Sequence, residues 1–112
     1  MADWDISSLS PAEPVRYRVQ LKLNGVDVNP TANVLTTAFA AEGAVPDPTV
    51  GAQWFATTWE TDAVAGGTKY YGVCLVGANG SADLASGQYT VYGRIVGAGI
   101  DVIRPVGVLQ VT

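Results

Sequence analysis

Histidine is absent from the 112 residues of this chain, which removes the side chain that most often acts as a general base or a metal ligand. Ser–His and Cys–His nucleophiles are excluded with it, whereas a hydrolase that works with carboxylates alone remains conceivable. The acidic residues fall almost entirely in expected turns and chain ends, where carboxylates are solvated and help to form turns. We therefore expect a protein that is not an enzyme.

Two pairs of acidic residues are close enough in sequence to share a hard cation. They are Asp3 with Asp5 and Glu60 with Asp62. A calcium ion takes about six to eight oxygen ligands, and neither pair lies in a recognisable calcium loop. The short glycine clusters do not precede a helix, where a phosphate would bind. We expect no metal and no cofactor.

The single cysteine, Cys74, cannot form a disulfide within the chain. Its neighbours Val73 and Leu75 are apolar. A cysteine nucleophile is activated by a nearby base, and histidine is missing. We expect Cys74 to be a small buried hydrophobic residue.

The net charge of −4 arises from six basic and ten acidic residues. Nucleic-acid binding depends on Lys and Arg that neutralise phosphates, so we expect no nucleic-acid partner. No apolar run approaches the roughly 18 residues of a membrane span, and the N-terminus lacks the basic and apolar regions of a signal peptide. We expect that the protein does not associate with membranes and that it is made in a cytoplasm.

Strict alternation of apolar and polar side chains over residues 15–23 predicts a strand with one buried and one solvated face. Asn24 and Gly25 follow it and are a strong signal for a two-residue hairpin turn, so residues 26–28 should form a short return strand.

Further strands are expected over residues 33–41, 52–60, 69–76, 88–96 and 102–112. Pro105 has no amide proton and predicts a bulge or an edge in the last of them. About seven strands separated by short turn-rich segments are typical of a β-sandwich. We predict one all-β domain, an immunoglobulin-like β-sandwich over residues 15–112.

Trp54 and Trp59 lie five residues apart in the expected strand 52–60, so they should face opposite sides of it. One of them should pack in the core, and we expect Trp54 to help define the fold. The other must be covered or exposed.

Residues 1–14 fit neither a strand nor a helix period and are interpreted as an extended N-terminal arm. Trp4, Ile6 and Leu9 are its apolar anchors. The arm has two possible roles: a strap over an open sheet edge of its own domain, or an assembly arm that docks on a neighbouring chain, with Trp4 as a hot spot. The second role makes these three residues the expected interface.

Leu84, Gly87, Tyr89 and Val91 form the pattern L-x-x-G-x-Y-x-V. In immunoglobulin-like domains, a tyrosine near the start of strand F bonds to backbone a few residues upstream, which forms a tyrosine corner. Gly87 would allow the tight turn into that strand. We expect these four residues to define the fold, although a tyrosine can begin any strand.

Four segments carry a family resemblance: W-x-x-x-x-W-E (54–60), K-Y-Y-G-V-C-L-V-G (69–77), L-x-x-G-Q-Y-T-V-Y-G-R-I (84–95) and R-P-V-G-V-L-Q-V-T (104–112). Together they resemble short immunoglobulin-like structural proteins of tailed bacteriophages, above all those of phages that infect actinobacteria. The resemblance covers roughly residues 15–112. It departs from the family before the final strand, where the charged turn of the relatives is replaced by the apolar GAGIDVI.

The resemblance implies a structural virion protein without catalytic residues. The expected function is a minor capsid protein that decorates the capsid surface, binds the major capsid protein and neighbouring copies of itself, and stabilises the head lattice. A tail, baseplate or head–tail protein is the alternative. A further alternative is a carbohydrate-binding module that stacks Trp54 or Trp59 on host-surface glycans.

Overall fold

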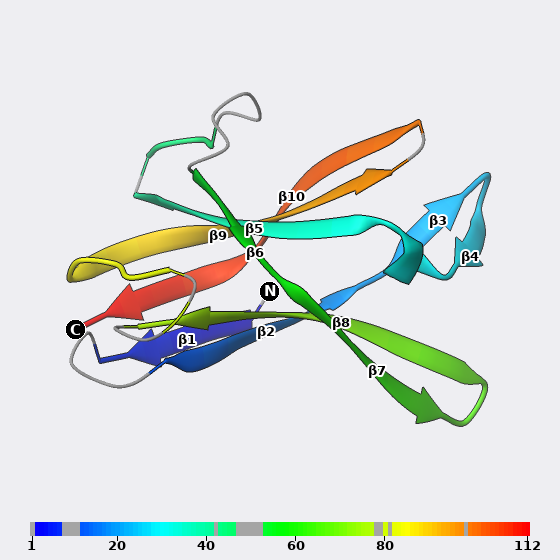
Figure 1. Cartoon of the computed structure of the whole chain (residues 1–112), viewed down its shortest axis with the longest axis horizontal. Helices are drawn as coiled ribbons and strands as arrows, with labels where there is room; N and C mark the ends of the chain where they lie inside the picture. Colours follow the sequence, from blue (N-terminus) through cyan, green and yellow to red (C-terminus); the bar gives the residue numbers. More distant parts are fainter. Residues whose placement is uncertain are drawn as a thin grey trace.

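The computed structural model describes residues 2–7, 12–41, 43–46, 53–77, 80, 82–97 and 99–112 (Figure 1). In this part of the chain the only helical element is one 3-10 turn, η1 (Pro30–Ala32). The strands are β1 (Ala2–Ile6), β2 (Glu13–Val19), β3 (Leu21–Leu23), β4 (Val26–Val28), β5 (Val34–Ala41), β6 (Trp54–Ala56), β7 (Thr58–Val64), β8 (Gly67–Val76), β9 (Gly87–Gly97) and β10 (Ile100–Val111).

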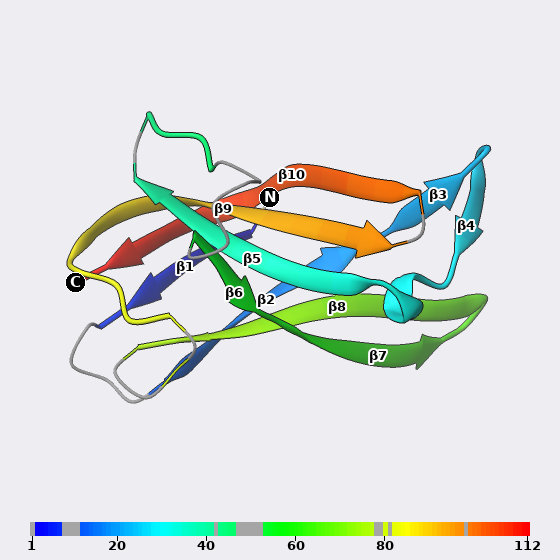
Figure 2. The same cartoon turned by 45° about the horizontal axis from the view of Figure 1, so that its top comes forward.

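These strands form two sheets that pack face to face, with the β3–β4 hairpin extending from one end (Figures 1 and 2). One sheet has the order β1-β10-β9-β5-β6, and the other has the order β2-β8-β7. The core between them takes Val15 and Val76 from the second sheet, and Val91 and Leu109 from the first, each at most 1% exposed. The predicted all-β sandwich is confirmed, with more strands than the seven expected.

Alternation of side chains determines β2, as the sequence predicted. Val15, Tyr17 and Val19 point into the core, and the residues between them are exposed. The expected strand 15–23 divides at Gln20, because β3 leaves the sheet to pair with β4. Asn24 and Gly25, with φ values of 53° and 78°, join these two short strands as the sequence predicted.

The expected strand 52–60 is wrong as a single element. β6 pairs with β5 in the five-stranded sheet, whereas β7 pairs with β8 in the three-stranded sheet. Thr57 lies between them, at the point where the chain crosses from one sheet to the other. Crossing requires a break in the regular pleat, and period-two alternation does not reveal such a break.

The final strand confirms the expected irregularity at Pro105. β10 pairs with β9 along its length, and the register shifts between Pro105 and Gly107. β10 begins at Ile100, two residues earlier than expected. A bulge bends and twists a strand, and this one separates Ile100–Arg104 from Gly107–Val111, the part of β10 that also pairs with β1.

The N-terminal residues form a strand rather than an arm without regular structure. β1 runs parallel to β10, from Ala2 opposite Gly107 to Ile6 opposite Val111. The expected division between residues 1–14 and 15–112 therefore does not match the strands, because β1 belongs to the five-stranded sheet and β2 starts at Glu13. The sequence did not predict this strand, because β1 pairs with a strand at the far end of the chain and such pairing produces no local sequence pattern.

Tyr17 connects the two sheets through their shared interior. Its hydroxyl lies 2.6 Å from the Thr37 hydroxyl, which lies 2.7 Å from the Thr57 hydroxyl. Thr57 donates its proton to the carbonyl oxygen of Phe55 at 3.1 Å. Since each hydroxyl has one proton, Thr37 must donate to Thr57, and Tyr17 must donate to Thr37. Burial raises the pKa of the Tyr17 phenol to about 12. The hydrogen bond with the Thr37 hydroxyl lowers this pKa, but by less than burial raises it.

We expect Tyr17→Phe to lower the free energy of unfolding by about 1 kcal/mol at neutral pH, because one buried hydrogen bond is lost while Thr37 keeps Thr57. The phenol pKa rises from 10.0 to about 12 on folding, so the stability from its neutral form is complete below pH 10 and lost as the pH rises towards 12. At about pH 11 the wild type should have lost about 1.4 kcal/mol relative to the variant.

Urea unfolding at the two pH values, followed by tryptophan fluorescence, measures this difference. Both proteins share every other titratable group, so the difference between the two curves isolates Tyr17. If the wild type and Tyr17→Phe differed in free energy of unfolding by the same amount at neutral pH and at about pH 11, the raised pKa of Tyr17 would be contradicted.

Candidate functional site

Cys74 offers no reactive group to a substrate. It is fully buried, and burial raises the pKa of its thiol to about 11. The thiol is therefore protonated at neutral pH, and the predicted small buried hydrophobic residue is confirmed. Among the described residues, no group of three or more His, Cys, Asp or Glu side chains could hold a metal ion. The remaining candidate sites lie on outer surfaces and edges of the sandwich.

No helix within the described ranges is long and apolar enough to cross a membrane.

The N-terminal anchors are used within their own domain. Ile6 is 3% exposed and belongs to the core, and the half-buried Trp4 packs against that core. Ile6 therefore has almost no surface to offer a neighbouring chain, and the interface role expected for it does not fit this structure. Of the two roles left open for residues 1–14, the strap along a sheet edge describes Ala2–Ile6. The predicted anchor Leu9 lies outside the described residues.

The four residues of the expected tyrosine corner lie together at the start of β9. The Tyr89 hydroxyl donates to the carbonyl oxygen of Ala85 at 2.8 Å, four residues upstream. Gly87 begins the strand with a φ of 151°, a conformation that L side chains rarely adopt. Val91 is fully buried, and Leu84 packs against the core. The predicted hydrogen bond from this tyrosine to upstream backbone is confirmed.

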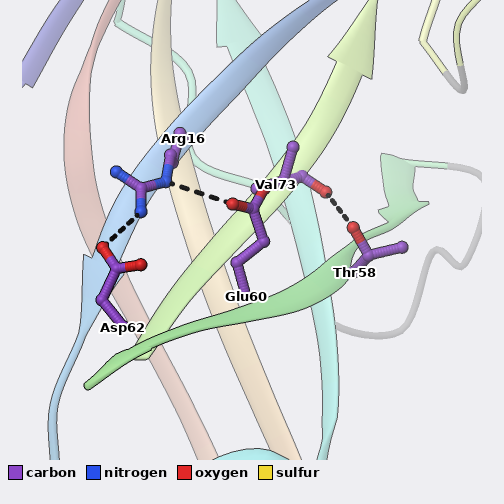
Figure 3. A network of polar contacts seen from close by, with 5 residues as sticks. All are labelled: Arg16, Thr58, Glu60, Asp62 and Val73. Atoms are coloured by element: carbon purple, nitrogen blue, oxygen red, sulfur yellow. Dashed lines mark hydrogen bonds and ion pairs between the residues drawn. The ribbon is translucent and has the colours of Figure 1, made fainter. Parts of the chain in front are cut away.

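One outer surface of the sandwich is a charged network on the β2-β8-β7 sheet (Figure 3). The Arg16 guanidinium lies over the Tyr71 ring, 3.6 Å from its centroid. It also contacts Asp62 at 3.1 Å and Glu60 at 3.5 Å. Two carboxylates already neutralise this arginine, so the network has no free positive charge for an anionic ligand. Exposed pairs of this kind contribute at most about 1 kcal/mol each.

The opposite outer surface, on the five-stranded sheet, holds Trp54. This tryptophan is half-buried, and the Arg94 guanidinium lies 5.4 Å from its ring centroid. Arg94 forms a bidentate pair with Asp101, with both distances 2.9 Å. Trp59, rather than the expected Trp54, packs against the core, and its indole nitrogen donates to the Asn33 carbonyl oxygen at 3.1 Å. The crossing at Thr57 places the two tryptophans on different sheets.

A groove opens between β2 and the first half of β10. Its volume is about 150 Å³. The walls come from both sheets and from the start of β3, and most of the side chains are apolar. Two arginines, Arg18 from β2 and Arg104 from β10, also line it. Sequence reasoning missed this groove, although the neighbouring Pro105 had already indicated an irregular edge.

Comparison with protein-family models finds no match, and neither the curated proteins nor the solved structures contain a significant match to this chain.

We expect Asp101→Asn to destabilise the protein at neutral pH and to have no effect in strong acid. The hydrogen bond from Arg94 lowers the pKa of Asp101 from 3.8, so its contribution is present above pH 3.8 and disappears as the pH falls through the folded-state pKa. The effect should be small and weakened by salt, because Asp101 is exposed.

Chemical denaturation of both proteins at pH 7 and at about pH 2 measures the change. Asp83→Asn is the matched control, since Asp83 is exposed and forms no ion pair with the described residues. Two results would contradict a stabilising role of the Arg94–Asp101 pair. One is equal destabilisation by Asp101→Asn and Asp83→Asn at pH 7, and the other is a destabilisation by Asp101→Asn that persists at about pH 2.

Proposed function

We infer that the sandwich is of the immunoglobulin variable type. In such domains, strands B, E and D form one sheet, and strands G, F, C and C′ form the other. Assigning β2, β5, β6, β7, β8, β9 and β10 to B, C, C′, D, E, F and G reproduces both orders, B-E-D and G-F-C-C′. β1 then adds to the free edge of strand G.

The tyrosine corner supports the same inference. Tyr89 stands near the start of strand F and bonds to the backbone at Ala85. In antibody domains, the second cysteine of the core disulfide follows this tyrosine by two residues. Val91 occupies that position and is fully buried. Packing would here replace the disulfide, and Cys74 lies on strand E instead.

We propose that this chain is a non-enzymatic structural protein of a virion and that it decorates the capsid. The observation that carries the proposal is that the four segments with the phage-protein resemblance become β6 and β7, β8, β9 with its corner, and β10 of one sandwich. A rigid domain of this kind acts by presenting surfaces. The major capsid protein and neighbouring copies are the proposed partners, on the capsid surface.

The sugar-binding alternative has less support from the positions of the tryptophans. Trp59 packs against the core and is held by its bond to Asn33. Only Trp54 lies on an outer face, where Arg94 is next to its ring. Binding of host-surface glycans would therefore depend on Trp54. The same fold would also suit a tail, baseplate or head–tail protein. Only the position of the protein in the particle distinguishes these roles from capsid decoration.

We expect cryo-EM of particles from a phage genome that encodes this chain to show a density for its 11.6 kDa repeated over the shell. Particles from the same genome with the coding region deleted should lack that density. Their heads should also release DNA at a lower temperature, because a protein that binds the assembled lattice stabilises it by mass action.

Density confined to the neck or tail would overturn decoration in favour of the tail alternative. Identical reconstructions with and without the chain would overturn the virion assignment. Saturable binding on a glycan array that is lost with Trp54→Ala, while the fold is retained, would assign the carbohydrate function instead.

A further inference from the structure

The open side of the sandwich is closed over only half of its length. β1 covers β10 from Gly107 to Val111, and Trp4 and Ile6 pack against the core there. Over Ile100–Val106, β10 pairs with β9 on one side and with no described strand on the other. β2 also has only one partner in the described part of the chain, β8. These two unpaired edges border the groove.

The groove has the size and polarity for one large apolar side chain. Its volume is about 150 Å³, and an apolar protein cavity of about that volume holds a benzene ring. Its apolar walls include Val19, Leu21, Leu35, Ile95, Val102 and Val106. An aromatic or branched aliphatic side chain that enters from the open side would be surrounded by the same kind of residues as in the core.

The charge at the groove specifies an acidic partner. Of the six basic residues, Arg16, Lys22 and Arg94 form ion pairs with carboxylates. Among the described residues, the other three basic side chains have no acidic partner, and two of these, Arg18 and Arg104, line the groove. An extended segment with carboxylates two positions before and after its apolar residue would be complementary to both, because residues two apart in a strand share a face.

β1 shows how the chain closes the other half of this side. Its residues alternate between Trp4 and Ile6, which face the core, and Asp3 and Asp5, which are exposed. The backbone amide of Val108 also donates to the Asp3 carboxylate at 3.3 Å. The unoccupied half continues directly from this contact, so a second extended segment fits beside it.

We propose that an extended segment of a partner protein, with a large apolar residue and acidic residues two positions to either side of it, adds as a strand to the edge of β10 beside this groove. Main-chain hydrogen bonds provide the affinity in such strand addition, and side-chain pockets provide the specificity. Pro105 has no amide proton to donate, so the new ladder is confined to Ile100–Arg104. One apolar side chain fills the groove, and the carboxylates two residues away from it, which point to the same face, contact Arg18 and Arg104.

The inference rests on the proposed function only for the identity of the partner, since the groove and its charges belong to this chain alone. The test uses the full chain, labelled with ¹⁵N and ¹³C-methyl groups, and capped pentapeptides with Glu at both ends, Ser next to each Glu, and Trp, Phe, Leu or Ile at the centre. We expect saturable binding of at least one peptide, with NMR shift changes in the amides of Ile100–Arg104 and in the methyl groups of Leu35 and Val102.

Arg104→Glu and Arg18→Glu should each weaken that binding by about tenfold, because a favourable contact becomes a repulsive one. Lys69→Glu is the matched control. It makes the same charge change at the third basic residue without an acidic partner, which does not line this groove. Peptides with Lys in place of Glu should not bind.

Several results would overturn the proposal. These are no binding of any peptide at millimolar concentration, equal loss of affinity with Lys69→Glu, or shift changes centred on Ala2–Ile6, which would indicate exchange with β1. Self-association in analytical ultracentrifugation that is abolished by Arg104→Glu would assign the groove to a second copy instead. Each result can be read whether or not the protein is found in a virion, so the two proposals can fail separately.

Discussion

The spacing of the two sheets depends on the side chain of Tyr17. A Cβ atom on Gly72, in its own sheet, would lie 3.1 Å from the tyrosine ring, and one on Gly93, in the facing sheet, would lie 3.2 Å from it. Glycine at both positions makes room for the ring between the sheets. A buried polar chain is stabilising only when every member is satisfied. The bonds from Tyr17 through Thr37 and Thr57 to the backbone of Phe55 meet that condition.

The same chain of hydroxyls fixes the place where the polypeptide changes sheets. Thr57 ends the hydrogen-bonded series and separates β6 from β7. Because β6 continues the five-stranded sheet and β7 belongs to the other, Trp54 lies outside one sheet while Trp59 packs into the interior. The hydroxyl series that begins at Tyr17, which is only 4% exposed, therefore ends at the point where the chain leaves Trp54 outside and takes Trp59 inside.

Local patterns in the sequence predicted the antiparallel strands, the Asn24–Gly25 turn, the bulge near Pro105 and the hydrogen bond of Tyr89, because each depends on neighbouring residues. The remaining features depend on contacts between distant segments. The pairing of Ala2–Ile6 with the far end of the chain is not encoded in a local period. The groove was also missed, since it exists only where one edge is left uncovered and two strands distant in sequence border it.

An apolar groove beside two unpaired strand edges would ordinarily promote aggregation. Here the same residues that define a partner also exclude unwanted ones. Arg18 and Arg104 repel basic segments, and the missing amide proton of Pro105 interrupts the edge. The net charge of −4 adds a general repulsion between copies. Only a short segment that supplies both an apolar side chain and carboxylates gains more binding free energy from the edge than is lost through desolvation of the two arginines. Protection of the free edge and recognition of a partner are therefore one property of this side of the sandwich.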